Sequence, residues 1–217
     1  MVLDALFITG KALLLAVPLM VVIGVFLGVV LARTEGVVRV TGQVIVLLPL
    51  VLPPTVVGYG LLMMLGQRGL EGILGMNVLF SWPAASLASC VVGIPLVVMS
   101  THAAVENVPE KVKQAAETLG SGQLGVLCRV TLPIAWPGIL AGIVLGTARA
   151  MGEFGATIMI AGNIPGRTQT VSLAVYEAVQ TRQYEVANVL VILLTVLCAL
   201  GVLMVNRLEL SSPTGRA

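Results

Sequence analysis

The stretch ALLLAVPLMVVIGVFLGVVLA, residues 12–32, carries no charge and lies between Lys11 and Arg33. A helix needs about 20 apolar residues to cross the hydrocarbon core of a bilayer. Over all 217 residues, 58% are hydrophobic and only 10% are charged. A soluble domain carries about 25% charged residues, and a disordered chain combines low hydrophobicity with high net charge. The composition excludes both classes and predicts an all-α membrane protein.

Four further runs have the length and apolar character of a membrane span. The third begins beside Trp82, a residue type that anchors helices at the membrane interface. The segment over residues 165–185 is too polar to span and carries the apolar stripe of an amphipathic helix. We expect one transmembrane domain over residues 5–207 and a tail over residues 208–217. Its five spans are expected at about residues 11–33, 41–65, 83–103, 134–160 and 186–207.

The lysine and arginine counts predict the orientation, because cytoplasmic loops are enriched in these residues. With an odd number of spans, the two termini lie on opposite sides. One side holds Arg33, Arg39, Lys111, Lys113, Arg129, Arg207 and Arg216, and the other holds Lys11, Arg68, Arg167 and Arg182. We therefore expect the N-terminus outside and the C-terminus in the cytoplasm. The net charge of +2 and the scattered basic residues do not indicate a nucleic-acid partner.

Prolines interrupt the second span at Pro49, Pro53 and Pro54. A proline frees a backbone carbonyl and kinks a helix. Lipid tolerates the freed group only where neighbouring helices or a wet cavity satisfy it. Pro53, Pro54 and Thr55 are therefore candidates for a broken helix that lines a pathway. A packing kink is an equally open alternative.

The fourth run contains two charges, Arg149 and Glu153, which share one face if the helix continues through both. Arg149 is expected about 20 Å along that helix, beyond the midplane. A lone charge there costs at least about 3 kcal/mol, so the two are expected to pair or to face a wet cavity. Two roles stay open: a lining of the outer pathway that tolerates a passing oxyanion, and a structural pair. Gly152 and Gly155 beside them permit close helix packing.

The longest predicted cytoplasmic loop covers about residues 105–132. Asn107 is expected to cap a helix whose first turn holds Pro109. Gly120 stands where a C-terminal glycine belongs, and Ser121 is expected to cap a second short helix. These features predict a rigid helical knob between the third and fourth spans.

This loop resembles the EAA loop of binding-protein-dependent ABC importer permeases. The family motif is Glu-Ala-Ala, three residues, Gly, nine residues, Ile, one residue, Leu-Pro, and its spacing is matched here. Gln114 replaces the glutamate and Val130 replaces the isoleucine. The resemblance implies that the loop is a coupling helix which docks onto a separate ATPase. The docking residues that it implies are Gln114, Ala115, Ala116, Glu117, Leu119 and Gly120.

Three more runs narrow the resemblance. Residues 49–58 and 148–157 are similar to signatures of molybdate and sulfate permeases, and residues 161–170 are most similar to the molybdate branch. The resemblance implies the type I ABC importer permease fold, in the inner membrane, and transport of molybdate by alternating access. Sulfate and tungstate are the alternatives. The implied partners are a second copy of the chain, two ATPase subunits, a periplasmic or extracellular oxyanion-binding protein and the lipid bilayer.

Other classes of function have less support. The sequence holds no G-x-x-x-x-G-K-[ST] motif, so ATP is expected to be used by partner subunits, with no cofactor bound to this chain and no enzyme activity of its own. Three distant cysteines and a single histidine predict no metal site. An intramembrane enzyme would have to join Glu153 to His102, which are predicted near opposite membrane faces. A secondary transporter is expected to show internal repeats, which are absent here.

Overall fold

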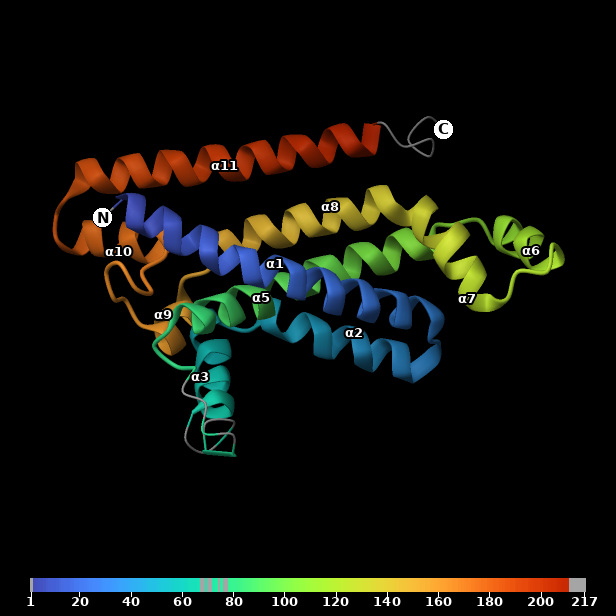
Figure 1. Cartoon of the computed structure of the whole chain (residues 1–217), viewed down its shortest axis with the longest axis horizontal. Helices are drawn as coiled ribbons and strands as arrows, with labels where there is room; N and C mark the ends of the chain where they lie inside the picture. The colour runs from blue at the N-terminus through green and yellow to red at the C-terminus, as the bar shows by residue number, and fades with distance from the viewer. Residues whose placement is uncertain (1, 67–68, 70–71, 74, 76–77, 211–217) are drawn as a thin grey trace.

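The computed structural model describes residues 2–66, 69, 72–73, 75 and 78–210, and within these ranges every regular element is a helix. The long helices lie side by side along the longest axis of the molecule, with α3 projecting from one side (Figure 1). The helices are α1 (Val2–Arg33), α2 (Gly36–Val51), α3 (Pro54–Leu65), α5 (Trp82–Glu106), α6 (Glu110–Thr118), α7 (Gln123–Val126), the π-helix η1 (Leu127–Thr131), α8 (Leu132–Met151), α9 (Gly155–Ala161), α10 (Val171–Gln180) and α11 (Tyr184–Leu210).

Four stretches of the described residues are long and apolar enough to cross a membrane: α1, α5, the continuous run Gln123–Met151, and α11 up to Val205. The pair α2 and α3 passes the same test together but is bent by 107°. The predicted class, an all-α membrane protein, is therefore confirmed, and the number of candidate spans is four, or five if the bent pair of α2 and α3 counts as one broken span.

Two helix boundaries differ from those expected. Helix α1 begins at Val2, well before residue 11, and Asp4 in its first turn suits the positive end of the helix dipole. Helix α8 ends at Met151, and Gly152 and Glu153 turn the chain before α9 begins at Gly155. The expected span over residues 134–160 is thus two helices, α8 and α9. The average hydropathy of the run does not show where such a turn falls.

Helix α5 forms the centre of the molecule, packed between α1 and α8. Fourteen of its residues are buried, many of them small. Gly24 and Gly28 of α1 lie directly against α5, and a Cβ at these positions would approach Val97 to 2.7 Å and Thr101 to 2.6 Å. The helices pack this closely because glycine has no side chain, a frequent arrangement between membrane helices.

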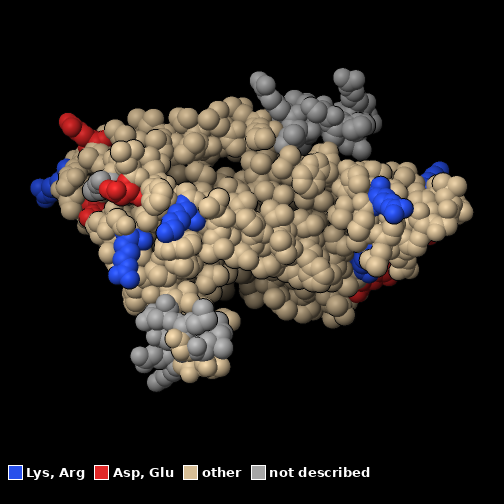
Figure 2. Space-filling model, in the orientation of Figure 1, with Lys and Arg blue, Asp and Glu red and all other residues tan. Residues whose placement is uncertain are grey.

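The two ends of the molecule carry different elements. The N-terminus, α9 and α10 lie at one end, and α6 and α7 lie at the other (Figure 1). Charged side chains gather at these ends on the face shown in Figure 2, with a largely uncharged band between them. Helix α10 buries Val171, Ala174 and Ala178 of the predicted apolar stripe, but Val179 is 48% exposed and the buried face includes Leu173 instead. The uncharged band is what a helix bundle in lipid needs on its outer surface.

Candidate coupling loop and pathway breaks

The coupling loop, residues 105–132, is built around α6 and a turn closed by glycine. Gly120 has φ +86°, a conformation that favours glycine. Its N–H donates to the Glu117 carbonyl at 2.9 Å, and the Ser121 N–H donates to the Ala116 carbonyl at 3.1 Å. This pair of bonds is the Schellman motif, which satisfies the last carbonyls of a helix. The predicted C-terminal glycine therefore has the expected geometry.

The two predicted side-chain caps of this loop are wrong. Helix α5 continues through Glu106, so Asn107 is the C-cap of α5 and its N–H donates to the Ala103 carbonyl at 3.0 Å. Helix α6 instead begins after Pro109, and no side chain caps it. Helix α7 begins after Gly122, where Ser121 makes no capping bond. Pro109 is itself the N-cap residue, so it precedes the first turn in which it was expected.

None of the residues of α6 is buried. Gln114, Ala115 and Glu117 are exposed, Ala116 is half-buried, and Leu119 is 87% exposed. Helix α6 lies at one end of the molecule and exposes alanines and Leu119. Another protein can pack onto such a surface. The implied docking residues therefore lie together on one accessible knob.

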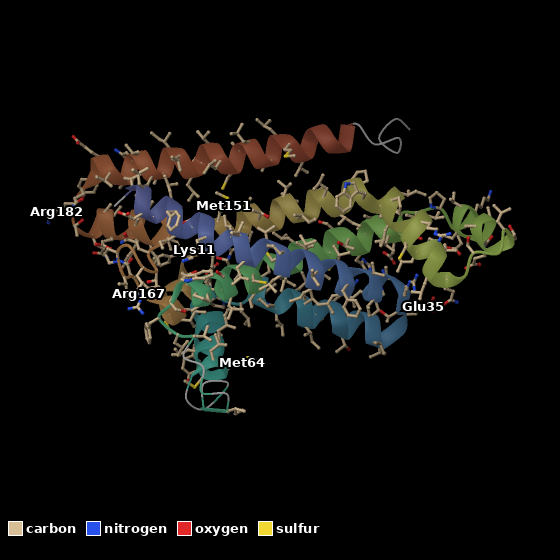
Figure 3. All side chains as sticks on the ribbon, viewed as in Figure 1. Lys11, Glu35, Met64, Met151, Arg167 and Arg182 are labelled. Atoms are coloured by element: carbon tan, nitrogen blue, oxygen red, sulfur yellow. The ribbon has the colours of Figure 1, made fainter. Side chains whose placement is uncertain are left out.

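An open groove of about 380 Å³ lies behind this knob. The end of α1 forms one wall, and α6, α7 and η1 form the other. Its charged lining residues are Arg33, Glu35, Glu110, Lys113 and Glu117. Glu35 lies at the α6 end of the molecule, whereas Lys11, Arg167 and Arg182 lie toward the other end (Figure 3).

The first break, Leu52–Pro53, separates α2 from α3. Leu52 has ψ 148° and Pro53 has ψ 134°, so both are extended, and the chain turns through 107° between the helices. Helix α3 starts at Pro54, which needs no N–H partner at this position. Pro53, Pro54 and Thr55 are all exposed in the single chain. The helix is thus broken where the prolines predict it.

The second break, residues 152–154, is held by a carboxylate. Glu153 is only 2% exposed, and its Oε2 lies 3.0 Å from Arg149 Nη1. Its Oε1 accepts a hydrogen bond from the Ala156 N–H at 2.9 Å. Both oxygens are therefore satisfied, one on each side of the turn between α8 and α9. The predicted pair forms across a turn, and only Arg149, with its side chain 31% exposed, keeps access to solvent.

The two breaks meet in space. A Cβ at Gly155 would lie 2.7 Å from Pro54 Cβ and 3.4 Å from the Thr55 nitrogen, and α3 packs along α9. Four of the predicted pathway residues, Pro54, Thr55, Arg149 and Glu153, therefore belong to one region, away from the coupling loop. Sequence reasoning noted Gly155 as a packing glycine but not its partner, since periodicity within each run says nothing about contacts between runs.

The enzyme alternative loses its geometric basis. His102 lies near the α6 end of α5, where its contacts are Gln43 and Glu106. Glu153 follows the opposite end of α8 and contacts Arg149 and the Ala156 N–H. The two residues belong to separate clusters. Within the described part of the chain, no three His, Cys, Asp or Glu residues are placed to hold a metal ion.

A bundle of apolar helices with two broken segments and one exposed knob at its end defines a multi-pass membrane subunit. The family described as "Binding-protein-dependent transport system inner membrane component" matches residues 20–210. This chain belongs to that family, and its fold is that of the type I ABC importer permeases.

Curated relatives agree with this assignment. The chain is 44% identical over 184 residues to the molybdenum transport system permease protein ModB of Haemophilus influenzae, covering 82% of this chain and 78% of that protein. It is 42% identical over 185 residues to ModB of Escherichia coli K12, covering 83% and 79%. It is also 38% identical over 209 residues to the chloroplastic sulfate permease 2 of Chlamydomonas reinhardtii, covering 94% of this chain and 56% of that protein.

Solved structures share the fold. The MetNI methionine ABC transporter in an inward-facing conformation matches with a TM-score of 0.72 and 18% identity, covering 95% of this chain and 93% of that chain. A bacterial alginate ABC transporter, solved with its alginate-bound periplasmic protein, matches with a TM-score of 0.74 and 18% identity, covering 95% and 77%.

Proposed function

We propose that this chain is the permease subunit of an ATP-driven importer that carries molybdate across the inner membrane. The observation that carries the proposal is the 44% and 42% identity to molybdenum permeases, over four fifths of this chain. The match to a sulfate permease points to the same ligand chemistry, a tetrahedral dianion. Sulfate and tungstate share that shape and charge and are the competing substrates.

The coupling loop is the docking site for the ATPase in this proposal. The support is its position at one end of the bundle, its exposure, and the fixed turn at Gly120. A rigid knob transmits force, whereas a mobile loop would absorb it. The chain then acts as a transport subunit without catalysis of its own, and ATP is bound and hydrolysed by its partners.

The complete transporter in this proposal holds two copies of the chain, two ATPase subunits and an oxyanion-binding protein outside. Helix α2 supports the paired arrangement, because it has no buried residue and presents a row of bare apolar side chains. They include Val37, Val44, Ile45, Leu48 and Val51. A second copy would cover part of this surface, and Pro53, Pro54 and Thr55 would then line a pathway between the two copies. Arg149 would face the passing oxyanion.

The orientation in this proposal places α6 in the cytoplasm. Because the first residues of α1 lie at the opposite end from α6, the N-terminus is then outside (Figure 1). Helix α11 runs back toward the α6 end, which places the C-terminus in the cytoplasm. The arginine and lysine counts support the same orientation.

Transport by vesicles tests the substrate and the class together. The chain is reconstituted with its ATPase and its binding protein, and uptake of radiolabelled molybdate is measured with ATP inside or outside. We expect uptake that requires ATP on the ATPase side and is inhibited by tungstate more than by sulfate. Uptake without the ATPase would refute the importer, and a preference for sulfate would replace molybdate by the alternative substrate.

The docking role has its own test in Gly120→Pro. Proline removes the N–H that binds the Glu117 carbonyl and cannot adopt φ +86°. We expect the ATPase to co-purify poorly and uptake to be lost. The matched variant is Gly10→Ala, where nothing lies within 4 Å of the added Cβ, and it should behave as wild type. Normal assembly and uptake by Gly120→Pro would refute the docking role.

A further inference from the structure

Four polar side chains join α2 to α5 near the coupling loop. Arg39 and Gln43 are four residues apart on α2, and His102 and Glu106 are four residues apart on α5. Arg39 Nη2 lies 2.6 Å from Glu106 Oε1, and His102 Nδ1 lies 3.6 Å from Glu106 Oε2. Gln43 Nε2 lies 3.5 Å from His102 Nε2. We name these four residues the α2–α5 strut.

The strut supplies the polar side-chain contacts that join α2 to α5. Helix α2 buries none of its residues, so apolar packing within the chain holds it weakly. Among the described residues, the side-chain ion pairs and hydrogen bonds of α2 all run to His102 and Glu106. The α5 side of the strut is firm, because His102 is only 4% exposed within the most buried helix of the bundle. A movement of this end of α5 therefore reaches α2 through the strut.

The strut lies between the coupling loop and the first break along the chain. Glu106 is the last residue of α5, and α6 of the coupling loop begins at Glu110. At its other end, α2 stops at Val51, directly before the first break. Sixteen residues make α2 about 24 Å long at 1.5 Å per residue. Helix α2 is thus a lever with the coupling loop at one end and the first break at the other.

We propose that the α2–α5 strut makes α2 follow the coupling loop, so that a displacement of α6 arrives at the Leu52–Pro53 break. The proposal rests on the proposed function, in which the ATPase moves α6. Glu106 is the central positioning residue, because one of its oxygens pairs with Arg39 on α2 and the other lies beside His102 on its own helix. None of the four residues is among the predicted pathway residues, and the effect expected from changing them is on how much transport each ATP yields.

Charge reversal separates this role from a merely structural one. Arg39→Glu and Glu106→Arg each place like charges together, and the double variant exchanges the two partners. In vesicles that contain the complete transporter, we expect each single variant to hydrolyse ATP while the amount of molybdate carried per ATP falls severalfold. The double variant should recover most of the molybdate transport per ATP. Thr41→Ala, an exposed position on α2, is the matched control and should be unchanged.

A covalent bridge supplies the second test. Arg39→Cys with Glu106→Cys, in a chain whose Cys90, Cys128 and Cys198 are replaced by serine, lacks the ion pair of the strut until a short bifunctional thiol reagent links the new cysteines. We expect poor coupling before linking and recovery after it. Loss of transport on linking would show that the two helices must separate, which refutes the strut. Unchanged coupling in both single charge variants would refute it as well, provided that wild-type vesicles transport; if they do not, the proposed function itself fails.

Discussion

The two breaks of the transmembrane region, at Leu52–Pro53 and at residues 152–154, differ in what holds them. At the first break, prolines set the backbone and no side chain bridges α2 and α3 among the described contacts. At the second, the buried Glu153 carboxylate binds Arg149 before the turn and the Ala156 N–H after it. The first is also exposed in the single chain, whereas Glu153 and Gly155 are buried.

This difference assigns separate mechanical roles. A break without a bridge can change its angle at little cost, while a buried carboxylate with both oxygens bound resists any change in the turn around it. Because Gly155 packs against Pro54, the fixed break provides the surface on which the free one rests. We therefore expect substitutions at the second break to reduce stability, and substitutions at the first to alter transport.

The largest effect is expected from Glu153→Ala. It leaves the Ala156 N–H and the part-exposed Arg149 guanidinium without their partner, and an unsatisfied buried donor costs about 1–3 kcal/mol, with more lost when the missing partner is charged. We expect a lower yield and a clear fall in the Tm of the purified chain in detergent. Glu185→Ala removes an exposed carboxylate and serves as the control, since it should leave Tm unchanged. An equal Tm for both variants would show that the bridge is dispensable.

A smaller effect is expected where the two breaks touch. In Gly155→Ala the new Cβ would lie 2.7 Å from Pro54 Cβ, so the helices must separate, and overpacking of this kind costs about 1–3 kcal/mol. Gly152→Ala is the matched control in the same turn, because its nearest neighbour would be at 3.8 Å. Thermal unfolding should therefore rank wild type and Gly152→Ala together above Gly155→Ala. The reverse ranking would contradict the packing of α3 on α9.

The smallest effect on stability is expected from Pro53→Ala. The exposed, extended residue makes few contacts, and removing a proline at a compatible position changes stability by less than about 1 kcal/mol. Transport is expected to change more, because alanine lets α2 and α3 sample other angles. Uptake and Tm are both measured for Pro53→Ala and for Gly155→Ala, and the change in uptake is compared with the loss of Tm in each variant. A Tm loss as large as that of Gly155→Ala would mean that the first break is not the freer of the two.

Hydropathy and motif spacing predicted much of this structure. The fold class, the interruption at Pro53 and the turn at Gly120 depend on local chemistry, namely apolar length, a missing N–H and a positive φ, which a sequence displays directly. The end of α8 at Met151 was missed because Arg149 and Glu153 were expected to share a face of one continuous helix, and the apolar residues resume after Glu153.

Contacts between distant segments could not be predicted in this way. The meeting of Gly155 with Pro54 depends on how α3 folds back after a 107° bend, and no residue pattern encodes that angle. The sequence indicates the α2–α5 strut only in part. Arg39 and Gln43 are polar residues four apart at the start of one apolar run, and His102 and Glu106 are four apart at the end of the next. The signal shows that each pair shares a helix face, but not that the two faces meet.

The central claim, that α6 is the handle held by the ATPase, is tested most directly by photo-crosslinking from position 119. A benzophenone amino acid replaces Leu119, which is 87% exposed at the end of α6, and a second variant carries it at Val189 on the exposed face of α11. In membranes that hold the complete transporter, position 119 should form an adduct with the ATPase subunit and position 189 should not. An adduct from position 119 with the binding protein, or none with any subunit, would contradict the account.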